Sequence, residues 1–295
     1  MTTIKSPVTR PQADSLGELG GSTYHKTFVR SGYAPVNGLQ MYYEIHGAAA
    51  TTTPLVTIHP WLGLANVFPS LIRNRQLIAV ELQGHGRTAD IDRPMTFEQH
   101  ADDVAALLRH LGIRRADFFG ESFGGTVAVS IAIRHPEIVR RVAIYGSILA
   151  RFEEVIPPKS LAEFLSLTPD HPSIQFEREN YERVAPDPAQ WPALFAKSSR
   201  VVWKGFSRDE LQSIEAPVLI AAGDHDVLVP PVEHHLEMSR LIPNAQLAVI
   251  PDAGHFVLYE DPEKVLPIVA NFLDQPASTV PFATTISGYH PGETR

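Results

Sequence analysis

Residues 116–125 of this chain read Ala116-Asp117-Phe118-Phe119-Gly120-Glu121-Ser122-Phe123-Gly124-Gly125. The run begins as a short buried strand would, and it ends in a Gly-x-Ser-x-Gly turn that leads into an expected helix, Thr126 to Arg134. So tight a turn gives the serine strained backbone angles, and only glycine two residues to either side leaves room for the neighbouring backbones. Ser122 is thereby exposed above a helix N-terminus, where unpaired N–H groups and the helix dipole favour a developing negative charge.

The pentapeptide also arises by chance, so its meaning depends on partners elsewhere in the chain. A serine hydroxyl is a poor nucleophile at neutral pH and needs a base that a third group holds in place. Two loops after expected strands supply such groups: Gly223-Asp224-His225-Asp226 and Pro251-Asp252-Ala253-Gly254-His255-Phe256. Because the carboxyl ends of parallel strands share one edge of a sheet, both loops and Ser122 are expected to converge there.

His255 would take the proton from Ser122 and deliver it to the leaving group, while a carboxylate fixes its tautomer. We choose Asp226 over Asp224 for the carboxylate, because Asp224 lies where a turn residue hydrogen-bonds its own backbone. The chain has 13 histidines, and a satisfied loop histidine is the alternative for His255. Its position after the last strand, behind a small Ala-Gly pair, favours the base.

Apolar runs and helical periodicity alternate along the chain. A Thr96–Gln99 capping box opens the clearest helix, which Gly112 closes. Strands are expected at 24–30, 39–46, 55–59, 77–82, from 116, 142–146, 218–222 and 247–250, and helices at 64–72, 96–111, 126–134, 232–241 and 261–273. This alternation predicts an α/β fold with a mostly parallel central sheet, helices on both faces and an antiparallel pair at one edge.

Residues 148–213 break the alternation, being rich in aromatic, acidic and proline residues without a strand pattern. Long insertions of this kind are usually functional, which favours a helical cap over the site. The core would then comprise residues 24–147 and 214–275. Residues 1–23 are expected to be a disordered arm and residues 276–295 a flexible tail.

Composition excludes several classes of function. The chain has 295 residues, a net charge of −8 and no long basic run, so neither nucleic acid nor a membrane surface is an expected partner. It has no cysteine, which excludes disulfides, thiolate nucleophiles and zinc–thiolate sites. The N-terminal residues lack an apolar signal region, and no segment approaches the ~20 apolar residues of a membrane helix, so we expect a cytoplasmic protein. The sequence leaves a homodimer open.

Four motifs occur in order: Gly84-His85-Gly86-Arg87-Thr88, Gly120-Glu121-Ser122-Phe123-Gly124-Gly125, Gly223-Asp224-His225-Asp226 with Pro230, and Ala253-Gly254-His255-Phe256. With these motifs the chain resembles the α/β-hydrolase superfamily, in its capped esterase-like branch, over residues of about 36–275. Phe123, the residue after the nucleophile, should give one backbone donor to an oxyanion hole. The resemblance implies that the second donor is the N–H of Trp61.

The family usually has His-Gly in that second loop, whereas this chain has His59-Pro60. Proline has no N–H, but the expected donor lies one residue later, so the hole is retained. The indole of Trp61 either roofs the acyl side of the pocket or packs in the core, and the sequence leaves both open.

These features predict a cofactor-free serine hydrolase that cleaves a small carboxylic ester or lactone through an acyl-enzyme on Ser122. Aromatic residues of the cap indicate an apolar substrate of moderate size, in a pocket lined by Trp61, Phe152, Phe164, Trp191 and Trp203. No metal site is expected, since the adjacent His234 and His235 point to different helix faces. The alternatives are a C–C bond hydrolase or a cofactor-free perhydrolase with the same triad, or a non-catalytic small-molecule receptor.

Overall fold

The computed structural model of the chain describes residues 26–48, 52–199, 203–229 and 232–276. The predicted N-terminal arm, and the predicted tail beyond Pro276, lie outside these residues.

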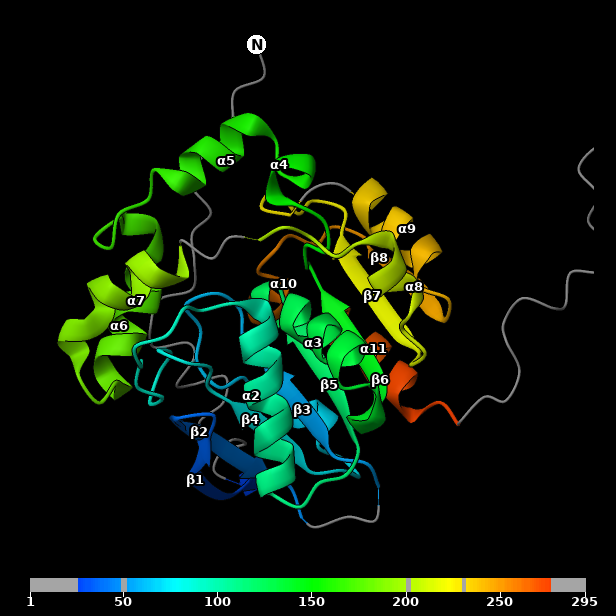
Figure 1. Cartoon of the computed structure of the whole chain (residues 1–295). Helices are drawn as coiled ribbons and strands as arrows, with labels where there is room; N and C mark the ends of the chain where they lie inside the picture. The colour runs from blue at the N-terminus through cyan, green and yellow to red at the C-terminus, as the bar shows by residue number, and fades with distance from the viewer. Residues whose placement is uncertain (1–25, 49–51, 200–202, 230–231, 277–295) are drawn as a thin grey trace, which may run out of the picture.

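The core is one eight-stranded sheet (Figure 1). Its strands are β1 (Phe28–Val36), β2 (Leu39–His46), β3 (Leu55–Ile58), β4 (Leu77–Val80), β5 (Ala116–Glu121), β6 (Val139–Tyr145), β7 (Val218–Gly223) and β8 (Ala245–Ile250). The spatial order is β1-β2-β4-β3-β5-β6-β7-β8. The pairs β1–β2 and β2–β4 are antiparallel and the other five are parallel. The predicted α/β fold with a mostly parallel sheet is therefore confirmed.

Helices cover both faces of this sheet (Figure 1). On one face, apolar side chains of α2 (Phe97–His110), α3 (Phe123–Arg134) and α9 (Val232–Leu241) join the larger core cluster. On the other face, α10 (Val257–Glu260) and α11 (Leu266–Asp274) pack with the 3₁₀ turn Pro69–Leu71 in a second cluster. The central strand β5 contributes to both clusters, with Phe118 on one side and Phe119 on the other, and each of these side chains is at most 1% exposed.

The clearest predicted helix is confirmed. Thr96 caps α2 by accepting a hydrogen bond from the Gln99 N–H at 3.0 Å. The Gln99 amide contacts Asp103 at 3.3 Å, so only the serine/threonine half of the expected capping box forms. Gly112 ends the helix with a φ of 71°, in the left-handed region that glycine adopts without strain.

Three local predictions are wrong. Residues 64–72 do not form a crossover helix, and only the turn Pro69–Leu71 is helical. Side chains from outside this segment instead bind backbone groups of the loop. Thr57 Oγ1 donates to the Asn66 carbonyl at 2.5 Å, and Glu81 accepts a hydrogen bond from the Ala65 N–H at 3.4 Å. The first strand begins at Phe28 rather than at residue 24, and helix α3 begins at Phe123, three residues before its expected start.

Between β6 and β7 the described chain is helical, with α4 (Phe152–Val155), α5 (Pro158–Leu165), α6 (Gln175–Val184), α7 (Trp191–Ser198) and α8 (Arg208–Gln212). This inserted helical segment has a small apolar core of its own, formed by Ile174, Tyr181, Trp191, Leu194 and Phe195. Leu62, from the loop after β3, and Met95 complete that core. The inserted segment is thus packed onto loops of the sheet domain rather than projecting freely.

The close contact of β5, α3 and β3 predicts that replacing Gly124 by alanine destabilises the fold more than the same change at Gly112. A Cβ at Gly124 would lie 2.2 Å from the Ile58 carbonyl oxygen, whereas a Cβ at Gly112 would meet nothing within 4 Å. We expect Gly124→Ala to cost about 3 kcal/mol or more of unfolding free energy, because backbone must move. Gly112→Ala should cost about 1 kcal/mol, from its positive φ alone. Urea unfolding followed by circular dichroism measures both, and equal losses would contradict the contact.

Candidate active site

Ser122 lies at the strained turn between β5 and α3. Its backbone angles are φ 51° and ψ −118°, and its side chain is partly exposed. The Ser122 N–H donates to the Tyr145 carbonyl of the neighbouring strand at 2.8 Å, and its own carbonyl accepts from the Gly125 N–H at 3.0 Å. A Cβ at Gly120 would lie 2.2 Å from the Gly124 carbonyl oxygen, so the turn closes only with glycine there.

His255 and Asp226 are in direct contact. Nδ1 of His255 donates to Oδ2 of Asp226 at 2.8 Å, and the side chains are 8% and 1% exposed. The other oxygen of Asp226 accepts the N–H groups of Leu228 at 2.9 Å and Val229 at 2.8 Å. Burial would raise the pKa of Asp226, but hydrogen bonds and charge from His255 outweigh it and hold that pKa below its usual value. The carboxylate thus stays ionised and places the imidazole proton on Nδ1.

This pair lies beside the strand end that holds Ser122. A Cβ at Gly146 would lie 3.1 Å from Asp226 Oδ2 and 3.2 Å from His255 Nδ1. Gly146 directly follows Tyr145, whose carbonyl binds the Ser122 N–H. The hydroxyl of Tyr145 also donates to the Gly254 carbonyl at 2.6 Å. This bond links β6 to the loop after β8 that carries His255, which we call the histidine loop.

Of the two candidate aspartates, Asp226 contacts His255. Asp224 is 38% exposed, and its Oδ1 accepts the Ala253 N–H at 3.2 Å. Its hydrogen bond therefore goes to the histidine loop rather than to its own turn, and it helps to hold that loop against β7.

The loop after β3 is held by His59. The Nε2 of His59 accepts the Leu82 N–H at 3.1 Å, so Nδ1 carries the proton and donates to the Pro60 carbonyl at 2.8 Å. That carbonyl also accepts the Gly63 N–H at 3.0 Å. Since C=O and N–H of a trans peptide point in opposite directions, the Trp61 N–H points away from this turn. Among the described residues, no acceptor is bound by the N–H of Trp61 or of Phe123.

The aromatic residues predicted for the pocket differ in their surroundings. The Trp61 ring lies 5.0 Å from that of Phe164 on α5, between ring centroids, and its Nε1 donates to Ser198 Oγ on α7 at 3.1 Å. Trp61 therefore lies against the inserted helical segment rather than in the core of the sheet. Phe152 is partly buried against the larger core cluster.

Two tryptophans from the same prediction are buried. Trp191 is 1% exposed, and its Nε1 donates to the Pro169 carbonyl at 2.7 Å. Trp203 is 6% exposed and packs edge-on against Phe97, with 4.6 Å between ring centroids. Their contacts favour packing roles over direct contact with a ligand.

Sequence reasoning missed three polar residues beside the site, namely Tyr145, Asn66 and Tyr259. The Tyr259 hydroxyl donates to Glu121 Oε2 at 3.0 Å, and Asn66 Nδ2 lies 3.5 Å from the same oxygen. Glu121 itself has the structural hydrogen bond expected of a buried carboxyl group. No local pattern in the sequence connects Glu121 with residues 55 positions before and 138 positions after it.

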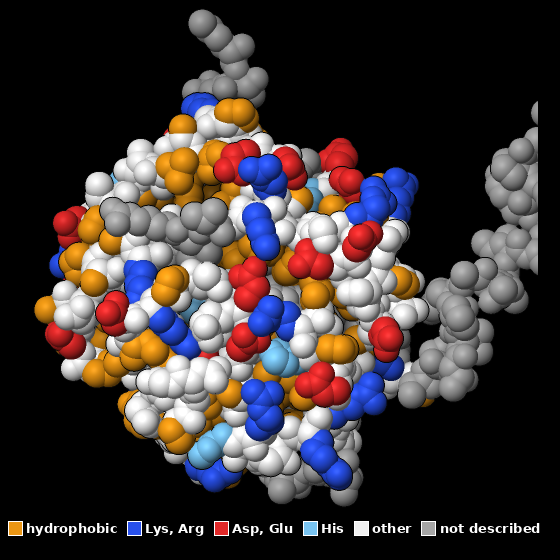
Figure 2. Space-filling view, viewed as in Figure 1, with side chains coloured by type: hydrophobic (Ala, Val, Ile, Leu, Met, Phe, Trp, Pro, Cys, Tyr) orange, Lys and Arg blue, Asp and Glu red, His pale blue; other side chains and the backbone are white. Residues whose placement is uncertain are grey.

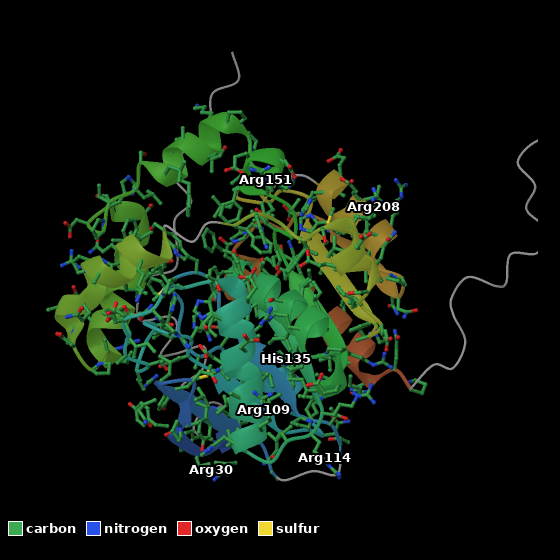
Figure 3. All side chains as sticks on the ribbon, in the orientation of Figure 1. Arg30, Arg109, Arg114, His135, Arg151 and Arg208 are labelled. Carbon is green, nitrogen blue, oxygen red and sulfur yellow. The ribbon has the colours of Figure 1, made fainter. Side chains whose placement is uncertain are left out.

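Figure 3 labels Arg109 on α2, Arg114 in the loop between α2 and β5, and His135 directly after α3, so none of these three basic residues belongs to the site. Within the described part of the chain, no group of three or more metal-ligating side chains is arranged to hold an ion. No described helix is both long and apolar enough to cross a membrane.

Comparisons with known proteins agree with this architecture. The model of the alpha/beta hydrolase family matches residues 45–268. The dihydrolipoyllysine-residue acetyltransferase component of the acetoin cleaving system of Pseudomonas putida is 28% identical, over 89% of this chain and 74% of that protein. A 2-hydroxymuconate semialdehyde hydrolase of Pseudomonas putida is 26% identical, over 68% of this chain and 78% of that protein. The solved structure of an N-acyl homoserine lactone degrading enzyme has a TM-score of 0.64 at 27% identity, over 82% of this chain and 100% of that chain.

Three buried histidines lie in or near the loop after β3 that carries Trp61, which we call the Trp61 loop. They predict that the folded protein loses stability in acid. Burial lowers the pKa of His85 to about 4 and that of His100 to about 3, and it lowers the pKa of His59 well below its usual value. Below about pH 6.5 these three histidines therefore bind more protons in the unfolded chain than in the folded chain. The free energy of unfolding falls for this reason as the pH drops from about 6.5 toward about 4. His100→Leu should recover about 2 kcal/mol of that loss.

Thermal melts between pH 7.5 and 4.5 measure this effect. His110→Gln, at an exposed position of the same helix, is the matched control and should keep the wild-type slope. An unchanged slope in His100→Leu would show that the buried imidazole does not limit acid stability.

Proposed function

Because this chain belongs to the α/β-hydrolase family, we propose that it is a serine hydrolase that cleaves a small carboxylic ester or lactone through an acyl-enzyme on Ser122. The observation that carries this proposal is the 2.8 Å contact between His255 and Asp226, beside the strained turn of Ser122. A base oriented by a buried carboxylate, near a serine that is forced out at a helix N-terminus, is the arrangement that acyl transfer requires.

In the proposed reaction, His255 Nε2 removes the proton of Ser122 as its Oγ attacks the acyl carbon. Asp226 stabilises the imidazolium that forms, because its carboxylate stays ionised and accepts the Nδ1 proton. The backbone N–H groups of Trp61 and Phe123 would hold the oxyanion, with the positive end of α3 beside them. His255 then protonates the leaving alcohol, and water attacks the acyl-enzyme by the reverse proton path.

The inserted helical segment supports an apolar substrate. We interpret it as a cap, since Trp61 beside the proposed oxyanion hole contacts α5 and α7. Trp61 and Phe164 would contact the substrate directly, in the site that the cap covers. The 27% identical lactone-degrading enzyme supports a lactone as one substrate form. The 26% identical semialdehyde hydrolase supports C–C bond hydrolysis as the second candidate.

The surface supports a small-molecule substrate rather than a polyanion. Figure 2 shows basic and acidic side chains interspersed on one face of the molecule, without a continuous basic patch there. With a net charge of −8, the chain would repel nucleic acid and anionic lipid surfaces.

Turnover of p-nitrophenyl butyrate tests the nucleophile. Ser122→Ala should lose roughly 10⁶-fold in kcat, because no acyl-enzyme can form. Ser239→Ala, on α9, is the matched control and should keep wild-type turnover. Equal rates for wild type and Ser122→Ala would reject the hydrolase, and tight ligand binding without turnover would instead favour the receptor. A panel of esters, lactones, C–C substrates and peracid formation then separates the reaction types.

The two aspartates should differ sharply in the same assay. Asp226→Asn should lower kcat about 10⁴-fold, since an amide at this position favours the wrong tautomer of His255. Asp224→Asn should cost less than about tenfold, because its contact is with the Ala253 N–H and it lies partly in solvent. If Asp224→Asn were the more damaging change, the acid would have to be reassigned.

A further inference from the structure

The carboxyl group that directly precedes Ser122 is buried in a polar cluster. Glu121 is 2% exposed. Its Oε2 accepts a hydrogen bond from the Tyr259 hydroxyl at 3.0 Å and lies 3.5 Å from Asn66 Nδ2, which is itself 3.4 Å from the Tyr259 oxygen. We call these three residues the Glu121 cluster.

The members of the Glu121 cluster come from the three segments that build the proposed site. Glu121 ends β5, one residue before the nucleophile. Asn66 belongs to the loop that carries Trp61, and its carbonyl is held by Thr57 of β3 at 2.5 Å. Tyr259 lies on α10, four residues after His255. The cluster therefore links the turn of Ser122, the Trp61 loop and the histidine loop through side chains.

Glu121 also interacts electrostatically with the titratable groups of the site. Its charge interacts with His255 and Tyr259 of the histidine loop and α10, with Asp226 of the loop after β7, and with Tyr145 of β6. Tyr259 in turn interacts electrostatically with Glu177 on α6 of the inserted segment. Of these groups, only His255 gains positive charge during the proposed reaction.

We propose that Glu121 is a positioning residue of the proposed hydrolase: its carboxylate joins the three loops through Tyr259 and Asn66, and its negative charge stabilises the imidazolium of His255 in the transition state. The proposal rests on the function proposed above. It assigns Glu121 a role beyond structure, because a neutral isostere keeps the hydrogen bonds but loses the charge.

The charge of Glu121 is present only above a certain pH. Burial raises the pKa of Glu121 to about 7, although His255 and the hydrogen bond from Tyr259 act to lower it. Below that pH the carboxyl group is neutral and resembles glutamine. Above it the carboxylate favours protonated His255, so the advantage of wild type over a glutamine variant must grow as pH rises through about 7.

The test compares the pH profiles of wild type and Glu121→Gln with p-nitrophenyl butyrate. Near pH 8.5, kcat of the variant should be about tenfold lower with KM unchanged, the effect of about one pKa unit on His255. Near pH 5.5 the two enzymes should agree within about twofold. A loss that is the same at every pH, or that appears in KM, would overturn the proposal in favour of a structural role.

Two further variants test whether this pH dependence comes from Glu121. Glu44→Gln is the matched control, since Glu44 is 3% exposed and accepts a tyrosine hydrogen bond from Tyr42 at 2.9 Å, on β2. Its ratio to wild type should not change with pH. Tyr259→Phe keeps the charge but removes a hydrogen bond that lowers the pKa of Glu121, so the inflection near pH 7 should move upward. An unmoved inflection would contradict the role of Glu121.

A measurement without turnover separates this proposal from the proposed function. In Ser122→Ala protein, histidine NMR titration should show the pKa of His255 falling by about 1 unit when Glu121→Gln is added. No fall would overturn the role of Glu121 even in an active enzyme. Absent turnover by wild type would reject the hydrolase, while the titration would still decide whether Glu121 acts on His255.

Discussion

The structure depends on the contact between three pieces of backbone at the turn of Ser122. Gly120 and Gly124 lie so close that a Cβ on the first would meet the carbonyl of the second at 2.2 Å, and Gly124 approaches Ile58 of β3 equally closely. This contact holds Ser122 at positive φ, a conformation that costs free energy for any residue but glycine. Burial of β5 between two apolar clusters offsets that cost, since its neighbours on both faces are packed. The strand, the turn and the helix are therefore one rigid unit.

Around that unit the loops are held by side chains rather than by regular secondary structure. Glu81 binds the Arg87 N–H at 2.5 Å and the Arg87 guanidinium at 2.7 Å, and it also accepts from Ala65 in the Trp61 loop. His59 joins the same loop to the segment just after β4 through the Leu82 N–H. Loops that carry a site need this support, because small displacements of reacting groups weaken catalysis strongly. Buried polar side chains at the strand ends thus give loop backbone the rigidity of the sheet.

Local patterns predicted much of this fold because their causes are local. Helix α2 was predicted to within one residue at each end, since its cap and its apolar face lie within one short segment. Residues 64–72 were misjudged because the apolar pattern there serves the second core cluster while Glu81 and Thr57 satisfy the backbone. Strand order predicted that the loops of His255 and Asp226 would converge near Ser122, and the choice of Asp226 over Asp224 came from loop position; the structure has His255 in contact with Asp226. The partners of Glu121 were not predicted, because Asn66 and Tyr259 carry no motif.

By itself the sequence determined the fold class, the strained turn and the residue types at the strand ends, because glycine spacing and apolar periodicity act over a few residues. Only the tertiary structure decided which groups touch. It put Trp61 against the inserted helices, buried Trp191 and Trp203 in packing contacts, and joined Glu121 to Tyr259 and Asn66. Such contacts depend on side-chain packing between segments that are distant in the chain, and no pattern within one segment contains that information.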